Sequence, residues 1–434
     1  MSCDKLNRRT FLKNSAAAAI SLPFFVKASA LGADGRPAAS ERIVMGCIGT
    51  GGMGTMDMQG FLSYPEVQIV AVCDVDRGHR NNAEYLVNQK YGNNNCVGYN
   101  DFRDLVTRED IDAVLNGTPD HWHTIPSIWA MRHGKDVYCE KPLTLTIKEG
   151  QEMRNAAARY GAVTQTGTWQ RSIHKFQVAN EIIKSGALGK IHRIEIGLPG
   201  SFTHGPQSVE PIPDGFDYDM WLGQAPWAPY NASRCHGMFR MTFDYSGGEI
   251  CDWGAHYLDT AQCGGGYDDT APVEIFGEGT FPTEGIWNTA TSYAITYKYA
   301  DGVEMWAHTQ DRNPDNFFFG AKFYGEDGKW LAVSREQFMS NPVDLVKVAV
   351  KEDEMRELWV SGSHHGNFLE CIRTRRETRT PFRATSRSIA LAHLGNISMR
   401  LERPLRFDPD KEVFLNDAEA NNMISRPMRS PWHL

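Results

Sequence analysis

Lys141 is the first residue in this sequence that could transfer protons. It stands directly before Pro142, and the proline restricts the lysine backbone to extended conformations. A lysine that is partly withdrawn from water can have a lowered pKa and exchange a proton with a reacting hydroxyl. Most lysines are exposed on the surface, so the catalytic interpretation requires a fold that places Lys141 beside a binding crevice.

Asp252 and His256 form the second chemically suggestive group. If a helix begins at Asp252, the two side chains lie one turn apart on the same face. A carboxylate beside an imidazole can orient the ring and raise its basicity, as a general base requires. The same spacing also suits a helix cap followed by a core histidine with satisfied hydrogen bonds. Asp259, three residues further on, fits either a solvated face or the same network.

A glycine-rich turn supplies a crevice for such residues. An apolar run ends at Ile48 and enters a G-x-G-x-x-G pattern, and the segment from Thr55 to Phe61 is typical of a helix. In this pattern the glycines permit a tight turn, close approach to a pyrophosphate, and close packing of helix against strand. The helix N-terminus also offers N–H groups to phosphates. The turn therefore predicts a dinucleotide site that includes Gly49, Gly51, Gly52, Met53 and Gly54.

The acidic residue expected in such a site is Asp74. It ends the apolar strand from Val67 to Cys73 and lies 20 residues after Gly54. A carboxylate here hydrogen-bonds the ribose 2′-OH of NAD and repels the additional phosphate of NADP. Arg77 would offset part of this repulsion. We therefore expect NAD as the cofactor, and NADP remains the alternative.

Residues 41–165 alternate strands and helices in the manner of a parallel sheet with helices on both faces. In such a Rossmann domain, ligands bind at the carboxyl ends of the strands. The glycine turn and Asp74 fall at those ends, as do two later loops. These loops add to the cofactor-binding candidates the residues Thr118, Pro119, His121, Glu140 and Lys141.

Residues 166–403 have a different pattern, with longer alternating strands such as Ser292 to Tyr299, rich in aromatic and β-branched residues. Such strands indicate a half-buried antiparallel sheet. We expect a C-terminal α+β domain with one large, mostly antiparallel, open-faced sheet and helices on its other face. An open apolar face favours a homo-oligomer, either a dimer or a tetramer. Residues 404–434 form a tail without an assignment.

A substrate cleft is expected beside the catalytic candidates. Residues 200–247 are rich in proline, glycine and aromatic residues and are suited to form a wall of this cleft. Core packing explains most tryptophans, although flat rings with polar edges also bind sugars. The substrate-binding candidates are Trp169, Gln170, Arg171, His236 and Trp253.

Neither metal binding nor disulfide formation has a clear pattern. The histidine pairs His121/His123 and His364/His365 do not belong to a set of three or four ligands at zinc spacing, so we expect no metal. Several cysteines lie in or beside apolar strands, where a thiol behaves as a small hydrophobic group. Disulfide pairing cannot be read from the spacing of the cysteines.

The N-terminus has the features of a twin-arginine export signal. Arg8 and Arg9 precede an apolar run from Ala16 to Val26, followed by a small-residue cleavage site at Ala28 to Ala30. A membrane anchor is the alternative, but about 12 apolar residues are too few to span a hydrocarbon core of about 30 Å. We assign residues 1–40 to signal and linker and expect a periplasmic protein without stable membrane insertion.

The charge of the chain excludes one class of partner. The whole sequence has a net charge of −8, and removing residues 1–30 takes away five basic side chains and one acidic one, which lowers it to about −12. An acidic chain without basic clusters is not a nucleic-acid-binding protein. The remaining length of about 400 residues is sufficient for two domains, each with its own core.

Three motifs occur in order: the glycine turn from Gly49 to Gly54, Glu140-Lys141-Pro142, and Asp252 with His256. Together they resemble the Gfo/Idh/MocA oxidoreductases over about residues 42–403. The resemblance implies a Rossmann domain, an open-faced sheet packed against helices, and nicotinamide chemistry on a sugar or cyclitol. It also implies that Lys141, Asp252 and His256 line the catalytic site, and that Thr118, Pro119 and Glu140 lie near the cofactor.

Two other functions remain open. Export favours a cofactor that is bound before transport and regenerated in place, either by a second carbonyl substrate or in a redox-neutral reaction. A redox-neutral NAD-dependent glycosidase or lyase would act through a keto-sugar. Glycosidases of the same superfamily carry a different sequence at Glu140-Lys141-Pro142, which favours the oxidoreductase. The other alternative is an exported sugar-binding protein without catalysis.

Overall fold

A six-stranded parallel sheet forms the N-terminal part of the fold, in a computed structural model that describes residues 37–347 and 363–434. Its strand order is β3-β2-β1-β4-β5-β6, and every pair is parallel. This is the strand order of a dinucleotide-binding Rossmann fold, which confirms the expected fold class. The strands are β1 (Ile43–Ile48), β2 (Val67–Cys73), β3 (Val97–Tyr99), β4 (Ala113–Asn116), β5 (Asp136–Cys139) and β6 (Thr164–Thr166).

Helices cover both faces of this sheet, because adjacent residues in a strand point to opposite sides. Val114 packs into one apolar cluster together with Phe102 of α4 (Phe102–Val106), whereas Leu115 packs into another with Phe61 of α2 (Gly52–Leu62). Both residues of β4 are therefore buried, as a central parallel strand requires. The helices are α2 (Gly52–Leu62), α3 (Arg77–Tyr91), α4 (Phe102–Val106), α5 (Thr124–Arg132) and α6 (Ile147–Tyr160).

Local capping signals determine where these helices begin and end. The Asp76 carboxylate accepts hydrogen bonds from two backbone N–H groups at the start of α3, and Thr146 with Glu149 forms a capping box on α6. Gly92 and Gly161 end the same two helices with φ angles of 63° and 62°, a conformation that favours glycine.

A nine-stranded sheet forms the second part of the fold, with the order β13-β12-β11-β7-β10-β9-β8-β14-β15. Only the β7/β10 pair is parallel, so the prediction of a mostly antiparallel sheet is confirmed. The strands are β7 (Arg193–Leu198), β8 (Glu274–Thr280), β9 (Ser292–Lys298), β10 (Glu304–Thr309), β11 (Gly320–Tyr324), β12 (Trp330–Val333), β13 (Phe338–Asn341), β14 (Leu405–Asp408) and β15 (Val413–Phe414).

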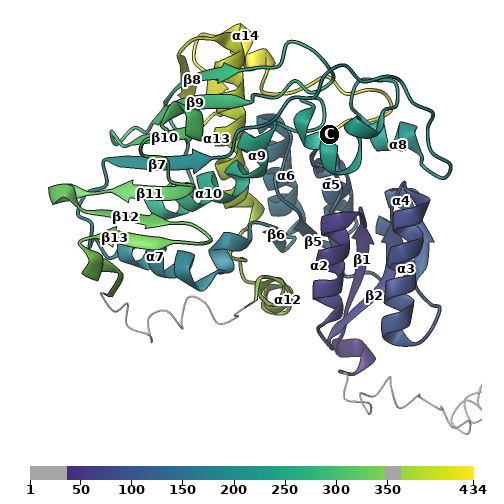
Figure 1. The fold of residues 1–434 in the computed structure, drawn as a ribbon. Helices are drawn as coiled ribbons and strands as arrows, with labels where there is room; N and C mark the ends of the chain where they lie inside the picture. The colour runs from purple at the N-terminus through teal and green to yellow at the C-terminus, as the bar shows by residue number, and fades with distance from the viewer. Residues whose placement is uncertain (1–36, 348–362) are drawn as a thin grey trace, which may run out of the picture. The chain divides into compact units, whose positions relative to one another are not determined.

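One face of this sheet is covered by helices and the other is open. Tyr297 of β9 is fully buried, whereas Phe276 of the neighbouring β8 is 40% exposed. The long helix α13 (Phe382–Leu401) contacts strand β8 on one side and, on the other, helix α6, which covers the first sheet (Figure 1). The remaining helices of this part are α7 (His174–Lys184), α8 (Tyr218–Leu222), α9 (Glu249–Asp252), α10 (Gly254–Gly265), α12 (His364–Thr374), α13 (Phe382–Leu401) and α14 (Ala418–Asn422).

The C-terminal tail, which the sequence left unassigned, extends this second sheet. Leu405 of β14 pairs with Ile275 of β8, and Phe407 pairs with Phe414 of β15. Further on, the Arg429 backbone N–H donates to the carbonyl of Gln224. Residues 43–434 form one compact unit, and the tail therefore supports both the sheet and the segment of residues 199–247.

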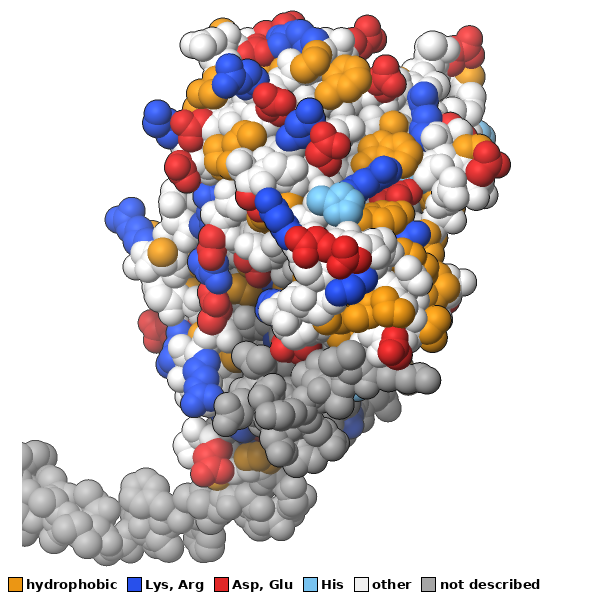
Figure 2. Space-filling model, turned by 90° about the vertical axis from the view of Figure 1, so that its left-hand side faces the viewer, with side chains coloured by type: hydrophobic (Ala, Val, Ile, Leu, Met, Phe, Trp, Pro, Cys, Tyr) orange, Lys and Arg blue, Asp and Glu red, His pale blue; other side chains and the backbone are white. Residues whose placement is uncertain are grey.

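Several expectations about composition can be compared with the described residues. Eight cysteines in this part of the chain are free and buried, as expected for structural thiols. Figure 2 shows basic and acidic side chains interspersed with hydrophobic ones over the face it presents. Within residues 37–347 and 363–434, no helix combines the length and apolarity needed to cross a bilayer. The twin-arginine motif lies outside the described residues.

Candidate active site

The glycine turn between β1 and α2 is shaped by backbone contacts that leave no room for side chains. Gly49 has a φ of +75°, and a Cβ atom on it would lie 2.5 Å from the backbone nitrogen of Thr118. A Cβ on Gly54 would lie 1.9 Å from the carbonyl oxygen of Gly49. The third glycine of the pattern therefore allows α2 to pack against the turn, as the sequence predicts.

Asp74 lies at the carboxyl end of β2, next to the glycine turn. Its Oδ2 accepts a hydrogen bond of 2.7 Å from the Thr50 backbone N–H, and its Oδ1 accepts one of 2.8 Å from the Asp76 N–H. These bonds hold the carboxylate at the wall of the cleft, where the Asp74 side chain is 9% exposed. Its remaining acceptor capacity suits a ribose diol.

A cavity of about 360 Å³ lies along the carboxyl ends of the first sheet. Its walls combine the glycine turn and neighbouring loops with the segment of residues 199–247, which contributes Phe216, Met220 and Phe239. Residues 200–247 were expected to wall a substrate cleft; the structure shows that they line the cavity beside the glycine turn, and their contact with a substrate stays a prediction. The lining contains most of the predicted cofactor-binding residues, namely Gly49, Gly51, Gly52, Met53, Asp74, Thr118, Pro119, Glu140 and Lys141.

Lys141 and Asp252 meet at the edge of this cavity. The Lys141 Nζ donates a hydrogen bond of 2.5 Å to Asp252 Oδ1, and Arg240 Nε donates one of 3.1 Å to the same oxygen. Lys141 and Arg240 both line the cavity. One carboxylate therefore holds two cations beside the cofactor cleft. The sequence predicted the first pair but missed Arg240, which lies in a short 3-10 helix (His236–Met241) with no recognisable motif.

His256 follows Asp252 by one helical turn, but the local structure differs from the predicted single helix. Helix α9 begins at Glu249 and ends at Asp252, and α10 begins at Gly254, with Trp253 in helical conformation between them. The predicted start at Asp252 is therefore three residues late, because Gly248, with a φ of 80°, provides the break. Asp252 is not a helix cap.

The protonation states in this group follow from burial and neighbouring charges. Burial raises the pKa of Asp252, but the cations Lys141 and Arg240 outweigh it and lower the pKa to about 2. Burial, Lys141 and Arg335 together lower the pKa of His256 well below its usual value. At neutral pH the carboxylate is therefore ionised and the imidazole neutral. The Nδ1 of His256 has no hydrogen-bond partner within the described part of the chain.

Asp120 adds a further carboxyl group to the cleft, beside Asp74 and Glu140. It lines the cavity while being buried from bulk solvent, and its Oδ2 accepts a hydrogen bond of 2.5 Å from Ser246 Oγ. Burial raises its pKa to about 7, although Arg240 acts in the opposite direction. Its position directly after Thr118-Pro119, at the end of a parallel strand, was a signal available in the sequence that we did not use.

His121, predicted to bind the cofactor, does not line the cavity. Its ring is fully buried, and its Nε2 lies 2.9 Å from the carbonyl oxygen of Trp221. His123 instead connects the two cofactor loops, because its ring nitrogens lie 2.7 Å and 2.8 Å from the carbonyl oxygens of Pro142 and Thr118.

Glu140 belongs to a buried acidic network behind the cleft. Its Oε2 accepts a hydrogen bond of 3.2 Å from the Lys141 backbone N–H. Burial raises the pKa of both Glu140 and the nearby Asp57, so we infer that these carboxyls hold a proton at neutral pH. Asp57 Oδ1 lies 3.1 Å from His365 Nε2. His365 is therefore a buried histidine whose ring contacts Asp57 in this network.

The predicted substrate-binding residues are dispersed. Arg171 is buried in a forked ion pair with Asp259, at 2.7 Å, and also contacts Asp268. Gln170 Oε1 accepts a hydrogen bond from Thr260, and Trp169 stacks on His364 at a centroid distance of 5.6 Å. These three side chains contact other protein groups and do not line the cavity.

The other two substrate candidates differ from each other. Trp253 is half-buried and stacks on Tyr257 at a centroid distance of 6.2 Å. His236 lines the cavity and is the one member of the predicted substrate set that does so. The structure thus brings Lys141 and Asp252 together beside most of the predicted cofactor residues, whereas four of the five predicted substrate-binding residues do not line the cavity.

The fold and this site define a dinucleotide-binding oxidoreductase architecture. Residues 43–168 match a family model described as the NAD-binding Rossmann fold of an oxidoreductase family, and residues 166–434 match the model of its C-terminal alpha/beta domain. The chain belongs to the Gfo/Idh/MocA oxidoreductase family and carries its NAD-binding domain.

Relatives within the family have several activities. A 2,7-anhydro-N-acetylneuraminate hydratase of Mediterraneibacter gnavus is 31% identical over 144 residues, which cover 33% of this chain and 36% of the hydratase. A glycosyl hydrolase family 109 protein of Saccharopolyspora erythraea is 35% identical over 167 residues, which cover 34% of this chain and 36% of the relative. The match therefore spans about a third of the length of each of these two relatives.

Solved structures share the fold over nearly the whole chain. The WlbA dehydrogenase of Bordetella pertussis, in complex with NADH and UDP-GlcNAcA, has a TM-score of 0.62 at 17% identity and covers 85% of this chain and 99% of its own. Levoglucosan dehydrogenase, in complex with NADH and levoglucosan, has a TM-score of 0.61 at 15% identity, with coverages of 84% and 99%.

Proposed function

We propose that this protein oxidises a hydroxyl group of a sugar or cyclitol with NAD, using Lys141, Asp252 and His256. The observation that carries the proposal is the Lys141 ammonium, which lines the cofactor cleft and lies 2.5 Å from Asp252. Dehydrogenases of the same fold are known in complex with NADH and a sugar ligand, which supports a carbohydrate substrate.

The cleft suits a dinucleotide because its turn excludes side chains at Gly49 and Gly54, and because the Asp74 carboxylate lines it where a ribose hydroxyl would bind. NAD⁺ bound there supplies an acceptor for the hydride of the substrate carbon. The neutral imidazole of His256 accepts the hydroxyl proton, and the Lys141 ammonium stabilises the developing negative charge on oxygen.

Asp252 serves this reaction as a positioning residue. Its pKa of about 2 keeps it ionised across the physiological range, so it holds the ammonium of Lys141 and the guanidinium of Arg240 at fixed positions. Without this carboxylate the two cations would repel each other at the edge of the cleft.

We also propose that the protein acts in the periplasm with a cofactor that stays bound through turnover. The Arg8-Arg9 signal supports export of a folded holoprotein. Free nicotinamide cofactor should be scarce outside the inner membrane, so the bound cofactor must be regenerated in place. The cover that Phe216, Met220 and Phe239 provide over the cleft supports slow release.

A redox-neutral glycosidase or lyase is the second candidate. The glycosyl hydrolase and hydratase names among the relatives support it, as does Asp120. A carboxyl in the cleft with a pKa of about 7 could protonate the leaving group as it is expelled together with the proton on the carbon beside the ketone, and water could then add to the resulting double bond. Bound NAD would supply the initial oxidation and the final reduction. The bound NAD would then end each turnover in the oxidation state in which it began.

Turnover assays on the periplasmic holoprotein test these proposals. Reduced nicotinamide is expected to accumulate on addition of one class of sugar, whereas the redox-neutral candidate predicts aglycone release without net accumulation. Lys141→Ala and His256→Ala should each lower the rate by about 10²- to 10⁴-fold with sugar binding retained. Lys90→Ala, at an exposed site on α3, is the matched control.

A non-catalytic sugar-binding protein would give a different result. The wild-type holoprotein would then bind sugar without forming reduced nicotinamide or product, and Lys141→Ala would change neither observation. Absence of nicotinamide in the denatured, purified periplasmic protein would contradict the bound-cofactor proposal directly.

We propose, finally, that the open face of the nine-stranded sheet joins copies of this chain. It presents Phe276 and Met339, which are 40% and 39% exposed, together with the half-buried Trp306. Burial of such a face between subunits would remove apolar surface from water.

A further inference from the structure

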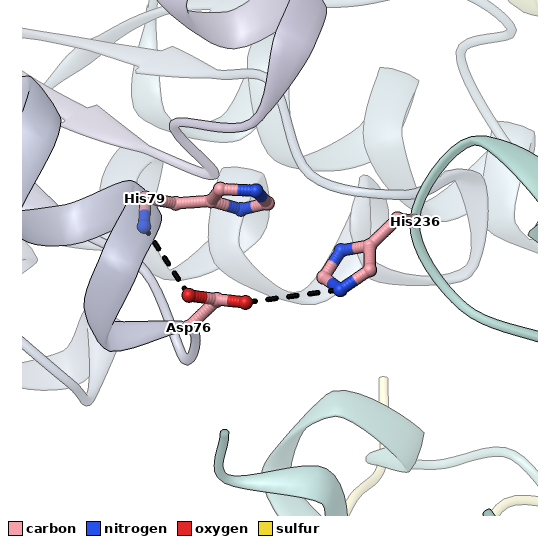
Figure 3. Close-up of side chains that lie close together, drawn as sticks. All are labelled: Asp76, His79 and His236. Atoms are coloured by element: carbon pink, nitrogen blue, oxygen red, sulfur yellow. Dashed lines mark hydrogen bonds and ion pairs between the residues drawn. The ribbon is translucent and has the colours of Figure 1, made fainter. Parts of the chain in front are cut away.

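Three side chains with metal-ligating atoms converge at the rim of the cofactor cleft. Asp76, His79 and His236 each offer one ligand atom, and these atoms all lie within 4.8 Å of one another (Figure 3). Asp76 follows β2, His79 lies in the first turn of α3, and His236 comes from the segment of residues 199–247. The sequence pattern did not indicate this set because its third member is remote in the chain.

Local structure holds the three groups in place. Asp76 Oδ1 accepts hydrogen bonds of 2.7 Å and 3.2 Å from the backbone N–H groups of Gly78 and His79, which leaves Oδ2 facing His236 Nε2 at 3.7 Å. The two imidazole rings lie 5.0 Å apart between centroids, at 70°. His236 has a φ of 49°, a conformation that is uncommon for residues other than glycine.

The donor set and its accessibility suit a transition metal. A distance of 3.7 Å between Asp76 and His236 is too long for a direct hydrogen bond. Two imidazoles and one carboxylate form the protein donor set of zinc sites that keep an open position. The side chains of His79 and His236 are 38% and 44% exposed, so an ion can enter. Asp74 Oδ2, 3.7 Å from His79 Nδ1, supplies a neighbouring carboxylate.

We propose that Asp76, His79 and His236 bind one divalent transition metal ion with the chemistry of zinc. The ion joins the turn after β2 to the segment of residues 199–247. These two parts of the chain already contact each other through backbone hydrogen bonds from Arg77 to Gly215, at 2.9 Å, and from Asp217 to Val75, at 3.0 Å.

The position of the ion gives it a structural consequence for the cofactor. His79 and His236 both line the cavity that the cofactor is proposed to occupy. A metal bound between them fixes the outer wall of that cavity and slows cofactor release. The site uses none of the residues assigned to proton transfer, so its failure would leave the proposed reaction intact.

Calorimetric titration with ZnCl₂ of the full mature chain, after treatment with a chelator and desalting, tests the site. We expect one saturable equivalent of zinc, and at least a tenfold loss of affinity in His79→Ala, His236→Ala and Asp76→Asn. The asparagine keeps an oxygen for the helix cap. His204→Ala, at an exposed histidine in the same segment of residues 199–247, is the matched control and should bind zinc like the wild type.

Two further measurements keep the test decisive. X-ray absorption of the zinc-loaded protein should show two imidazole nitrogens, and a chelator should accelerate loss of NAD from the holoprotein. No saturable binding, unchanged affinity in both histidine variants, or a spectrum without imidazole would overturn the metal site. Zinc binding with an unchanged rate of NAD loss would overturn the proposed effect on the cofactor. Melting curves establish that each variant is folded.

Discussion

The ammonium of Lys141 lies 2.5 Å from Oδ1 of Asp252, although the two residues are 111 positions apart in the chain. Lys141 is the second residue after the end of the fifth parallel strand, whereas Asp252 ends a short helix of the second part of the fold. The candidate site is therefore assembled where the two parts meet, and Arg240 adds a second cation to the same carboxylate.

Asp252→Asn tests whether this carboxylate positions Lys141. The substitution leaves two cations without a counter-charge, and we expect the rate to fall by about 10- to 10³-fold. Because the folded-state pKa of Asp252 is about 2, below that of an unfolded aspartate, its stabilisation is present above about pH 4 and lost as the pH falls through 2. The variant should therefore be less stable at pH 7, measured by thermal melting. An unchanged rate would contradict the positioning role.

Asp120 gives stability a dependence on pH of the opposite sign. Its folded-state pKa of about 7 exceeds that of an unfolded aspartate, so the folded state binds more protons between about pH 4 and 7. Its contribution is most favourable below pH 4 and is lost as the pH rises through 7. Asp120→Asn keeps a partner for Ser246 and should flatten this dependence, so that the variant gains stability relative to wild type at pH 8. If the melting temperatures of the wild type and of Asp120→Asn changed in the same way from pH 5 to 8, the pKa of Asp120 could not be raised.

Gly54→Ala should abolish tight cofactor binding. A Cβ atom would lie 1.9 Å from the carbonyl oxygen of Gly49, so α2 must move away from the turn that holds the pyrophosphate. We expect loss of bound nicotinamide and a lower melting temperature. Gly205→Ala is the control, because a Cβ there meets nothing within 4 Å and Gly205 does not line the cavity. Equal nicotinamide content in the two purified variants would refute this description of the turn.

Arg171 should affect stability and not substrate affinity, contrary to its predicted role in binding. It is 4% exposed and bonded to Asp259 and Asp268. Arg171→Lys cannot reproduce the fork, and we expect the melting temperature to fall by several degrees while KM is unchanged. A raised KM with an unchanged melting temperature would restore Arg171 to the substrate site.

Phe276→Glu tests the open face of the second sheet. The side chain is exposed in the single chain, so a charge there should leave the monomer folded but weaken association. Light scattering after gel filtration should show a smaller particle than for wild type. Val209→Glu, at a residue that is 71% exposed in another segment, should leave the particle size unchanged. A monomeric wild-type protein would refute association through this face.

The elements with strong local signals could be predicted from the sequence. Strand β2 has the predicted bounds, because an apolar run ends at a charged residue. The strands β12, β13 and β14 were missed because each has only four residues, too few for a clear alternating pattern.

In the candidate site, too, the residues that belong to a local sequence motif could be predicted. Lys141 and Asp252 were predicted because each belongs to a motif, and the structure brings them together. Arg240 and the contact of His236 with Asp76 depend on how the segment of residues 199–247 folds back over the cleft. Arg171 was predicted to bind substrate, whereas the structure places it in a buried ion pair with Asp259; residue type alone cannot distinguish these two environments.

The most direct measurement is the absorbance of reduced nicotinamide in the purified holoprotein during addition of single sugars and cyclitols, beside Lys141→Ala and Lys90→Ala. We predict that at least one of these compounds reduces the bound cofactor in the wild type and in Lys90→Ala, and that the rate falls at least a hundredfold in Lys141→Ala. Reduction of the cofactor at the same rate in Lys141→Ala would contradict the account. It would also be contradicted if the wild type bound sugar but neither reduced its cofactor nor converted the sugar to a product.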